Sequence, residues 1–382
     1  MNDSLEEDLF FGNCSTIQEI SYEDVDLVWI RVLFAIFYSV LWVTAVVGNS
    51  LVLYVVVLNQ VSLSVRSVFI GCLAVSDLLM ALTSLPVTAV TIFTRNWIFP
   101  SFFCKLIGVF QGGSIFVSSF TLTAIAIDRC LLIIRPNKQV MSFNRAALTV
   151  LGIWILGYSL ALPVGIYSRD VAYPGICGTF CEEYWPDFTE DTQRSDSRRL
   201  YGLSVLLLQF AMPALISSFC YWMISRVISD QIERRRGHNL RTEAEEKLVN
   251  RKARANRMML FMVFCFILCW SPINMLNLYR DFINIHTPKW FNITFAFSHA
   301  IAMASAVANP VIYSWFNPQF RSVIQYIFNR RNQMMKRMSF PNSTTYKTDP
   351  IFRPIDSKKR SELIVPEKID DLCLPNEADE LL

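Results

Sequence analysis

Seven long apolar stretches divide the chain, at residues 30–58, 67–93, 103–134, 146–167, 200–228, 257–281 and 290–315. Each reaches about the 20 residues that a helix needs to cross the ~30 Å hydrocarbon layer of a membrane. The connectors are short except at 168–199 and 229–256, and no fixed period repeats along the chain. This pattern predicts an all-α membrane protein built as a seven-transmembrane helix bundle.

A weaker periodic pattern follows the seventh stretch. A helix over 317–331 would gather four apolar side chains on one face and also carry three arginines: Phe320, Ile324, Ile327 and Phe328, with Arg321, Arg330 and Arg331. Such a pattern is typical of an amphipathic helix lying on a membrane surface. We therefore expect an N-terminal segment at 1–29, a bundle at 30–316, a surface helix at 317–331 and a disordered tail at 332–382.

The composition supports a membrane protein surrounded by lipid. Apolar residues make up 53% of the chain and charged residues 18%, against about 45–50% and about 25% in soluble domains. The net charge of +3 excludes a nucleic-acid binder that relies on bulk positive charge. The apolar content excludes a chain that is disordered throughout.

Charged residues are distributed unevenly, and their distribution predicts the orientation. The first thirty residues hold eight acidic residues and neither Lys nor Arg, whereas basic residues recur after the first, third and fifth stretches. By the positive-inside rule the N-terminus is extracellular and the C-terminus cytoplasmic, in a multi-pass protein of the plasma membrane. Asn2 and Asn13 then lie in glycosylation motifs on the outer side, whereas Asn342 lies in a matching motif inside.

Polar and helix-bending residues are costly inside a membrane and are therefore functional candidates. One set runs through all seven stretches: Asn49, Asp77, Asp128-Arg129, Trp154, Pro213, Trp270 with Pro272, and Asn309-Pro310 followed by Tyr313. In this order the set resembles the rhodopsin-like G-protein-coupled receptors over about residues 30–330. The resemblance implies a receptor that is not an enzyme, with a heterotrimeric G protein, a receptor kinase and arrestin as partners.

Asp77 is the centre of a predicted polar cluster. Asn49, Ser118 and Asn309 lie on neighbouring stretches and are candidate partners of this carboxylate. The resemblance implies that the cluster holds an allosteric sodium ion, and we expect no other cofactor. A hydrogen-bonded cluster with a purely structural role is the alternative.

Arg129 is the centre of a predicted activation switch. We expect it to pair with Asp128 at rest and to meet the G protein once freed, with Tyr221 and Tyr313 moving toward it. Lys252 stands where many members of the family place a glutamate, so the usual ion pair between Arg129 and the sixth stretch is not expected. The full set of switch residues is Asp128, Arg129, Tyr221, Trp270, Asn309, Pro310 and Tyr313.

Four cysteines lie on the predicted outer side, which allows three pairings. They are Cys14, Cys104, Cys177 and Cys181. The resemblance implies a Cys104–Cys181 disulfide that ties the second outer loop to the third stretch. Cys177 is the alternative partner of Cys104, and a second bridge between Cys14 and Cys177 is a further hypothesis.

The predicted ligand pocket lacks the residues of two well-known receptor classes. Met303 stands where an opsin needs its Schiff-base lysine, and Gln111 where an amine receptor needs a carboxylate. One face of the sixth stretch instead collects polar side chains at intervals of four, three and four residues: Trp270, Asn274, Asn277 and Asp281. A neutral amide such as that of Gln111 both donates and accepts hydrogen bonds, which suits an amide on a ligand.

A further set resembles the neuropeptide Y and neuropeptide F receptors, including invertebrate receptors of this kind: Gln111, Gln209, Asn277, Asp281 and His299, with Trp97. The resemblance implies an extracellular peptide ending in an amidated Arg-Phe or Arg-Tyr, and a G protein of the inhibitory class. Asp281 and Asn277 would bind ligand arginines, and Gln111 the amidated end.

Three structural alternatives remain open for these residues. Asp281 would be solvated or paired with Arg280, His299 would be a packing residue, and Gln209 would join two helices. The alternative functions are a receptor for another amidated peptide that couples to a different G-protein class and, in another class altogether, a transporter. A transporter would need inverted repeats or broken helices, and the sequence has no sign of either. The three histidines, at 238, 286 and 299, are too far apart in sequence to suggest a metal site.

Overall fold

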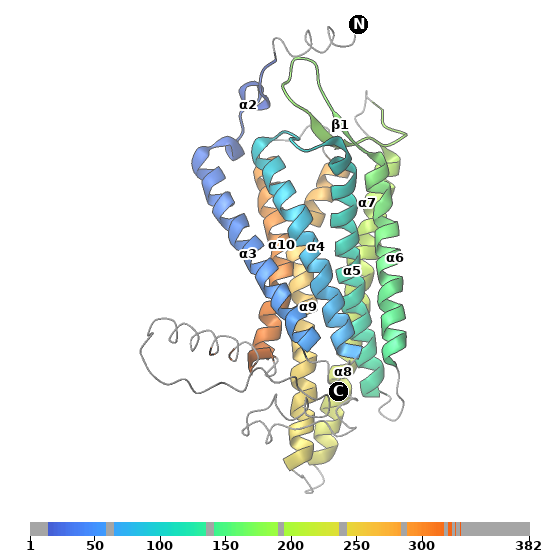
Figure 1. Cartoon of the computed structure of the whole chain (residues 1–382). Coiled ribbons are helices and arrows are strands. Elements are labelled where there is room, and N and C mark those ends of the chain that lie inside the picture. Colours follow the sequence, from blue (N-terminus) through green and yellow to red (C-terminus); the bar gives the residue numbers. More distant parts are fainter. Residues whose placement is uncertain are drawn as a thin grey trace, which may run out of the picture. The chain divides into compact units, whose positions relative to one another are not determined.

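We describe a computed structural model of the chain at residues 14–58, 65–134, 141–189, 195–236, 243–283 and 289–316, and at 320–322, 325 and 329. The predicted seven spans are present, and they run side by side (Figure 1). Six are α3 (Val28–Leu58), α4 (Val65–Thr94), α5 (Ser101–Ile134), α6 (Phe143–Tyr167), α9 (Glu243–Phe282) and α10 (Phe291–Phe316). The fifth is composite: α7 (Asp196–Val205), a π-helical turn η2 (Leu206–Ala211) and α8 (Met212–Arg236).

Short elements gather at one end of the bundle. The strands β1 (Ser168–Val171) and β2 (Phe180–Glu183) form an antiparallel hairpin in which Ser168 pairs with Glu183. The N-terminal segment adds the helix α2 (Ile17–Ile20) and the 3-10 turn η1 (Asp24–Asp26). We call this the hairpin end. We call the opposite end the Arg129 end, because Arg129 lies there near the C-terminal end of α5.

The two ends of the chain lie largely outside the described residues. Asn2 and Asn13, the glycosylation candidates, are not among them, and neither is the tail from 332. The chain divides into two compact units, Met1–Asn317 and Pro318–Leu382. Of the predicted surface helix only 320–322, 325 and 329 are described, each of them helical.

Burial separates the central helices from the lipid-facing ones. In α4 and α10, 61% of the residues of the most apolar window are buried inside the protein, compared with 11% in α6. Small residues let the central helices approach closely, as is common in membrane bundles. A Cβ added at Gly48 of α3 would lie 2.8 Å from Cγ of Pro310 in α10. The polar residues singled out in the sequence therefore lie on helices that are shielded from lipid.

Candidate functional site

Asp77 is held at the centre of the bundle by two of its three predicted partners. Its Oδ1 accepts a hydrogen bond from Ser118 Oγ at 3.2 Å, and its Oδ2 accepts one from Asn309 Nδ2 at 2.8 Å. The third candidate, Asn49, lies elsewhere. Its amide donates to the carbonyls of Ala45 and Ala306, both at 2.9 Å, and so joins α3 to α10.

A cavity beside Asp77 connects this cluster to Trp270. It is lined by Asp77, Ser118, Ser305, Asn309 and Trp270 together with apolar side chains. Trp270 Nε1 donates to Ser305 Oγ at 3.1 Å, a partner that the sequence analysis missed. The lining offers one carboxylate with hydroxyl and amide oxygens, which is the oxygen donor set that hard cations prefer. A single carboxylate balances one positive charge, so the residues fit a monovalent ion.

Arg129 lies at the other end of the bundle, paired with its neighbour Asp128 at 3.2 Å. A second cavity there is lined by Asp128, Arg129 and Tyr313 and, from α9, by three methionines: Met258, Met259 and Met262. The α9 side chains lining this cavity are thus apolar. The side chain of Lys252 is outside the described residues, so the expected lack of an α9 ion pair remains a prediction.

The two tyrosines of the predicted switch are buried near this end. Tyr221 is 2% exposed and Tyr313 is 3% exposed. The Tyr313 hydroxyl has no hydrogen-bond partner among the described residues. An unsatisfied buried hydroxyl is costly. Any arrangement that brings this hydroxyl a hydrogen-bond partner is therefore stabilised.

Both predicted outer disulfides are present at the hairpin end. Cys104 is joined to Cys181, the pairing that the resemblance implied, and Cys14 is joined to Cys177. The first ties β2 to the start of α5. The second ties the N-terminal segment to the loop between β1 and β2, where Ser15 also exchanges backbone hydrogen bonds with Gly175 and Cys177.

Gln209 lies in the π-helical turn and contacts α5 in two ways. Its backbone carbonyl accepts a hydrogen bond from Ser119 Oγ at 2.6 Å, and its side-chain Nε2 donates to the carbonyl of Gly112 at 3.2 Å. Pro213, four residues later, has no backbone N–H to donate to this carbonyl, which is thus available for such a contact. The geometry therefore favours the structural alternative, in which Gln209 joins two helices. Gln111, next to Gly112, is half-buried.

Asp281 is engaged by arginines of its own chain. Its Oδ1 lies 3.1 Å from Arg280 Nε and 3.7 Å from Arg198 Nε, and its side chain is 8% exposed. Arg198 also lies 3.6 Å from Glu183 of the hairpin. The pairing with Arg280 that the sequence analysis left open is present. Asn277, about one turn earlier, is half-buried and makes no side-chain hydrogen bond to described residues.

Two further acidic residues in the described part of the second loop also have partners. Glu182 accepts a hydrogen bond from the Tyr173 hydroxyl at 2.7 Å. Asp187 accepts hydrogen bonds from the Ser195 hydroxyl and the Ser197 backbone amide. These bonds lower the pKa of the Asp187 carboxyl to about 2. This carboxylate therefore stays charged at neutral pH and holds the start of α7 rather than waiting for a ligand.

His299 is fully buried and has two different sides. Its Nδ1 lies 3.0 Å from the hydroxyl of Tyr38, whose ring stacks on the imidazole, whereas Nε2 has no partner among the described residues. The Tyr38 hydroxyl also lies 3.0 Å from the carbonyl of Ala296. We assign its one proton to that carbonyl, because a carbonyl only accepts. With this assignment, a neutral imidazole donates from Nδ1 to Tyr38, and its Nε2 is a buried acceptor.

Tyr38 was missed by the sequence analysis, and so were Ser305 and Arg198. Each contacts a predicted site residue on another helix. Tyr38 contacts His299, 261 residues away, Ser305 contacts Trp270, 35 residues away, and Arg198 contacts Asp281, 83 residues away. Tyrosines, serines and arginines of this kind are common in membrane helices and at their ends. No local pattern could have singled them out.

Comparisons with known proteins agree with this geometry. A family model described as "7 transmembrane receptor (rhodopsin family)" matches residues 48–313. Neuropeptide receptor 3 of Caenorhabditis elegans is 62% identical over 334 residues, 87% of this chain and 88% of that protein. The neuropeptide F receptor of Drosophila melanogaster is 30% identical over 81% of this chain and 65% of its own length. The RYamide receptor of the same fly is 29% identical over 83% of this chain and 69% of its own. The chain belongs to the rhodopsin family of seven-transmembrane receptors, which are receptors and not enzymes.

Proposed function

We propose that the chain is a receptor for an extracellular peptide with an amidated Arg-Phe or Arg-Tyr end, and that it activates heterotrimeric G proteins of the inhibitory class. The observation that carries the proposal is the buried Nε2 of His299, which has no partner among the described residues and which we assign as an acceptor. Relatives named as neuropeptide F and RYamide receptors support it.

The protonation of His299 discriminates between an amide and a carboxylate on the ligand. A terminal amide offers two N–H donors, of which one can satisfy Nε2. A terminal carboxylate at neutral pH offers acceptors only, and it would place a negative charge against a lone pair in a buried site. Leaving such a group unpaired costs several-fold to a hundredfold in affinity.

The ligand's arginine binds Asp281 by replacing an arginine of the receptor. Asp281 is already close to Arg280 and Arg198, so an incoming guanidinium takes the place of one of them instead of filling an empty site. Asn277 supplies a free amide oxygen on the same helix face. Because one ion pair replaces another, this contact serves specificity more than affinity.

The orientation belongs to the same proposal. Two disulfides lie at the hairpin end, and disulfides persist on the oxidising side of a membrane. The hairpin end and the N-terminus are therefore extracellular, and the Arg129 end meets the G protein in the cytoplasm. The serines and threonines that a receptor kinase and arrestin would use, at 339 and 343–345, lie outside the described residues.

The cavity beside Asp77 holds a sodium ion in the resting receptor. Asp77, Ser118 and Asn309 already contact one another there. With Ser305 they supply the oxygen ligands, and the ion supplies a positive charge that balances the buried carboxylate.

A peptide panel on membranes from cells expressing the chain tests the main proposal. Each sequence is made with a terminal amide and with a free acid, and guanine-nucleotide exchange is measured on an inhibitory and on a stimulatory G protein. We expect Arg-Phe and Arg-Tyr amides to stimulate exchange on the inhibitory protein, with the acids at least about 10-fold weaker. Equal potency of amide and acid would remove the role given to His299. A response confined to other amidated peptides or another G protein would favour the alternative receptor.

A further inference from the structure

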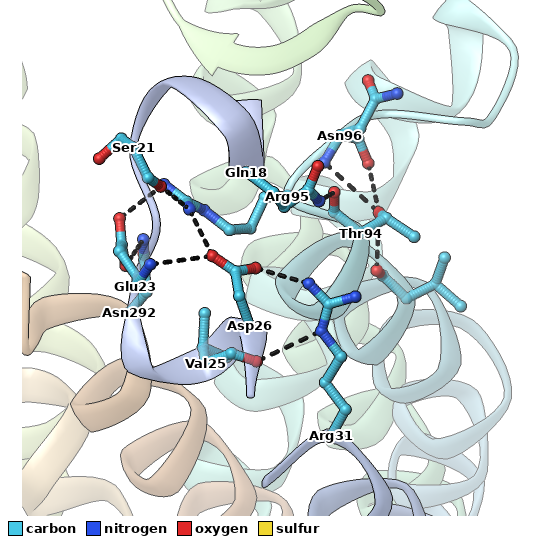
Figure 2. A network of polar contacts seen from close by, with 11 residues as sticks. Gln18, Ser21, Glu23, Val25, Asp26, Arg31, Thr94, Arg95, Asn96 and Asn292 are labelled. Carbon is cyan, nitrogen blue, oxygen red and sulfur yellow. Dashed lines mark hydrogen bonds and ion pairs between the residues drawn. The ribbon is translucent and has the colours of Figure 1, made fainter. Parts of the chain in front are cut away.

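Arg95, just beyond the end of α4, is the centre of a buried ion-pair network at the hairpin end (Figure 2). Its Nη2 lies 2.6 Å from Glu23 Oε1, and its Nη1 lies 2.9 Å from Asp26 Oδ2. Nη1 also donates to the carbonyl of Ser21 at 2.6 Å. One guanidinium thus holds three groups of the N-terminal segment.

The network extends to two further helices. Arg31 of α3 lies 2.6 Å from the other oxygen of Asp26. Asn292, in the first turn of α10, donates to Glu23 Oε2 at 2.8 Å. We call these five residues, Glu23, Asp26, Arg31, Arg95 and Asn292, the N-terminal clamp. Figure 2 shows them converging from the N-terminal segment, α3, α4 and α10.

The clamp is balanced in charge, and its centre is shielded from water, whereas Arg31 at its edge is 36% exposed. The side chains of Arg95 and Glu23 are each 10% exposed, and that of Asp26 is 2% exposed. Two carboxylates face two guanidinia. Removing Arg95 leaves the buried Glu23 without an ion-pair partner and Asp26 with Arg31 alone, which costs more than breaking a surface ion pair.

The backbone conformation of Arg95 is unusual and has to be held in place by its contacts. Its φ of +50° is the only positive value at a non-glycine residue among those described. A residue with a branched or long side chain adopts this conformation only when its surroundings hold it there. Here the surrounding contacts include those of the guanidinium, the backbone bond from Arg95 N to the carbonyl of Thr91 at 2.9 Å, and a hydrogen bond from Gln18 Nε2 to the carbonyl of Thr94 at 2.7 Å.

The clamp lies on the same helices, α3 and α10, as the Tyr38–His299 contact of the proposed ligand site. Arg31 precedes Tyr38 on α3, and Asn292 precedes His299 on α10, each by about two turns. On α4, the ring of Phe93, next to the end of the helix, contacts the rings of Phe34 and Tyr38 at 5.9 and 6.0 Å. A shift of α3 relative to α10 at the clamp would therefore reach the Tyr38–His299 contact through rigid helices.

We propose that the N-terminal clamp positions the ligand site, with Arg95 as a positioning residue that acts through Tyr38 and His299. It fixes the separation of α3 and α10 and thereby the hydrogen bond that leaves Nε2 of His299 as an acceptor. The Cys14–Cys177 bridge holds the other end of the same segment to the hairpin. The N-terminal segment is on this view part of the receptor's binding architecture and not a free tail. The inference rests on the proposed function for the identity of the ligand.

The first test measures ligand affinity in a charge-removing variant. Arg95→Met keeps an unbranched side chain, so the positive φ costs the same, but it removes the ion pairs. Arg169→Met is the matched control, because Arg169 is an exposed arginine of the same end that stacks on Tyr184 at 3.6 Å. With a labelled peptide ending in Arg-Tyr-amide, we expect about a 10-fold loss for Arg95→Met at equal surface expression. The control should bind as the wild type does.

Double-mutant cycles separate positioning from general weakening. Arg95→Met combined with His299→Ala should lose less than the sum of the two single losses, because both act at one contact. Arg95→Met combined with Asp281→Asn should be additive, because Asp281 is held by a different set of arginines. Additivity with both partners, or an unchanged affinity in Arg95→Met, overturns the proposal.

A ligand-independent measurement keeps the two proposals distinguishable. Amide hydrogen exchange of the purified full-length receptor should rise in Arg95→Met at 17–31 and 291–299 but not at 196–205. An unchanged exchange rate at 291–299 overturns the clamp whatever the peptide does. If the wild-type receptor binds no amidated peptide, the proposed ligand is wrong, and the exchange result alone decides whether the clamp positions α10.

Discussion

At the scale of single residues, a side chain's role depends on what its partners leave unsatisfied. His299 has one nitrogen occupied by Tyr38 and one without a partner among described residues. Asp281, which looks more like a ligand site in the sequence, is already close to two arginines. The histidine is therefore the more informative residue about the ligand, because an unpaired buried acceptor demands a donor.

Asp281→Asn tests charge recognition by exchange. The amide nearly keeps the shape but removes the charge, and it leaves Arg198 and Arg280 without their shared carboxylate to repel an incoming arginine. We expect about a 10-fold loss for a peptide ending in Arg-Tyr-amide. A peptide with that arginine replaced by norleucine should lose little further on the variant.

The matched control is Glu182→Gln, at an exposed acidic residue of β2 whose partner is Tyr173. It should change affinity little, because a screened surface charge contributes little. If the losses from Asp281→Asn and from the altered peptide simply add, the ligand arginine is bound elsewhere.

At the scale of elements, glycines decide which helices meet closely. A Cβ at Gly165 of α6 would lie 2.7 Å from the carbonyl of Lys105 in α5, whereas a Cβ at Gly152 of the same helix meets nothing within 4 Å. The start of α5 also carries Cys104, whose bridge holds the hairpin. Packing of α6 against α5 thus helps to set where the hairpin lies.

Gly165→Ala should destabilise the receptor by about 1–3 kcal/mol, because the added methyl group forces the two helices apart. Gly152→Ala, at an open position, should be neutral or stabilise by up to about 1 kcal/mol, since alanine favours the helix. Thermal unfolding of the two purified variants in the same detergent compares them. Equal melting temperatures would mean that α5 and α6 adapt to the methyl group without cost.

At the scale of the whole molecule, a line of contacts runs through the bundle between its two ends. Trp270 bonds to Ser305 in the cavity beside Asp77. Met262 of α9 lines both that cavity and the one beside Arg129. A movement of α9 at Met262 would therefore change the surroundings of Asp77 and of Arg129 together.

Sodium bound beside Asp77 should change the affinity of the receptor for its agonist. Replacing sodium by N-methylglucamine in the assay buffer should raise the affinity of wild-type receptor for the agonist peptide by about 5-fold or more, since the ion favours the resting state. Asp77→Asn removes the balancing charge and should abolish the dependence. A variant that still responds to sodium would show that the ion acts at another site.

Arg129→Ala should separate binding from signalling. Arg129 lies about 40 Å along α5 from the hairpin end, by the ~1.5 Å rise per residue of a helix, so peptide binding and surface expression should be retained. Nucleotide exchange on the G protein should fall to the basal level because the arginine at the Arg129 end is missing. Normal coupling by this variant would exclude Arg129 from the switch.

Much of the fold follows from local patterns. Each apolar stretch is a property of consecutive residues, and the hydrocarbon layer leaves a helix as the only way to satisfy its backbone. The seven spans were therefore predicted to within a few residues at most ends. The ordered series from Asn49 to Tyr313 identified the family, which the comparisons established. The π-helical turn in the fifth span was not predicted.

The sequence by itself determined the membrane spans, the family and the candidate residues, because these depend on composition, spacing and order along one helix. Only the tertiary structure decided which candidates are satisfied and which are not. Asn49 joins two carbonyls, Gln209 contacts α5, and His299 keeps a free acceptor. The N-terminal clamp likewise joins residues up to 269 positions apart. Hydrogen bonds and ion pairs between helices depend on distance in space, and no local pattern in the chain encodes that distance.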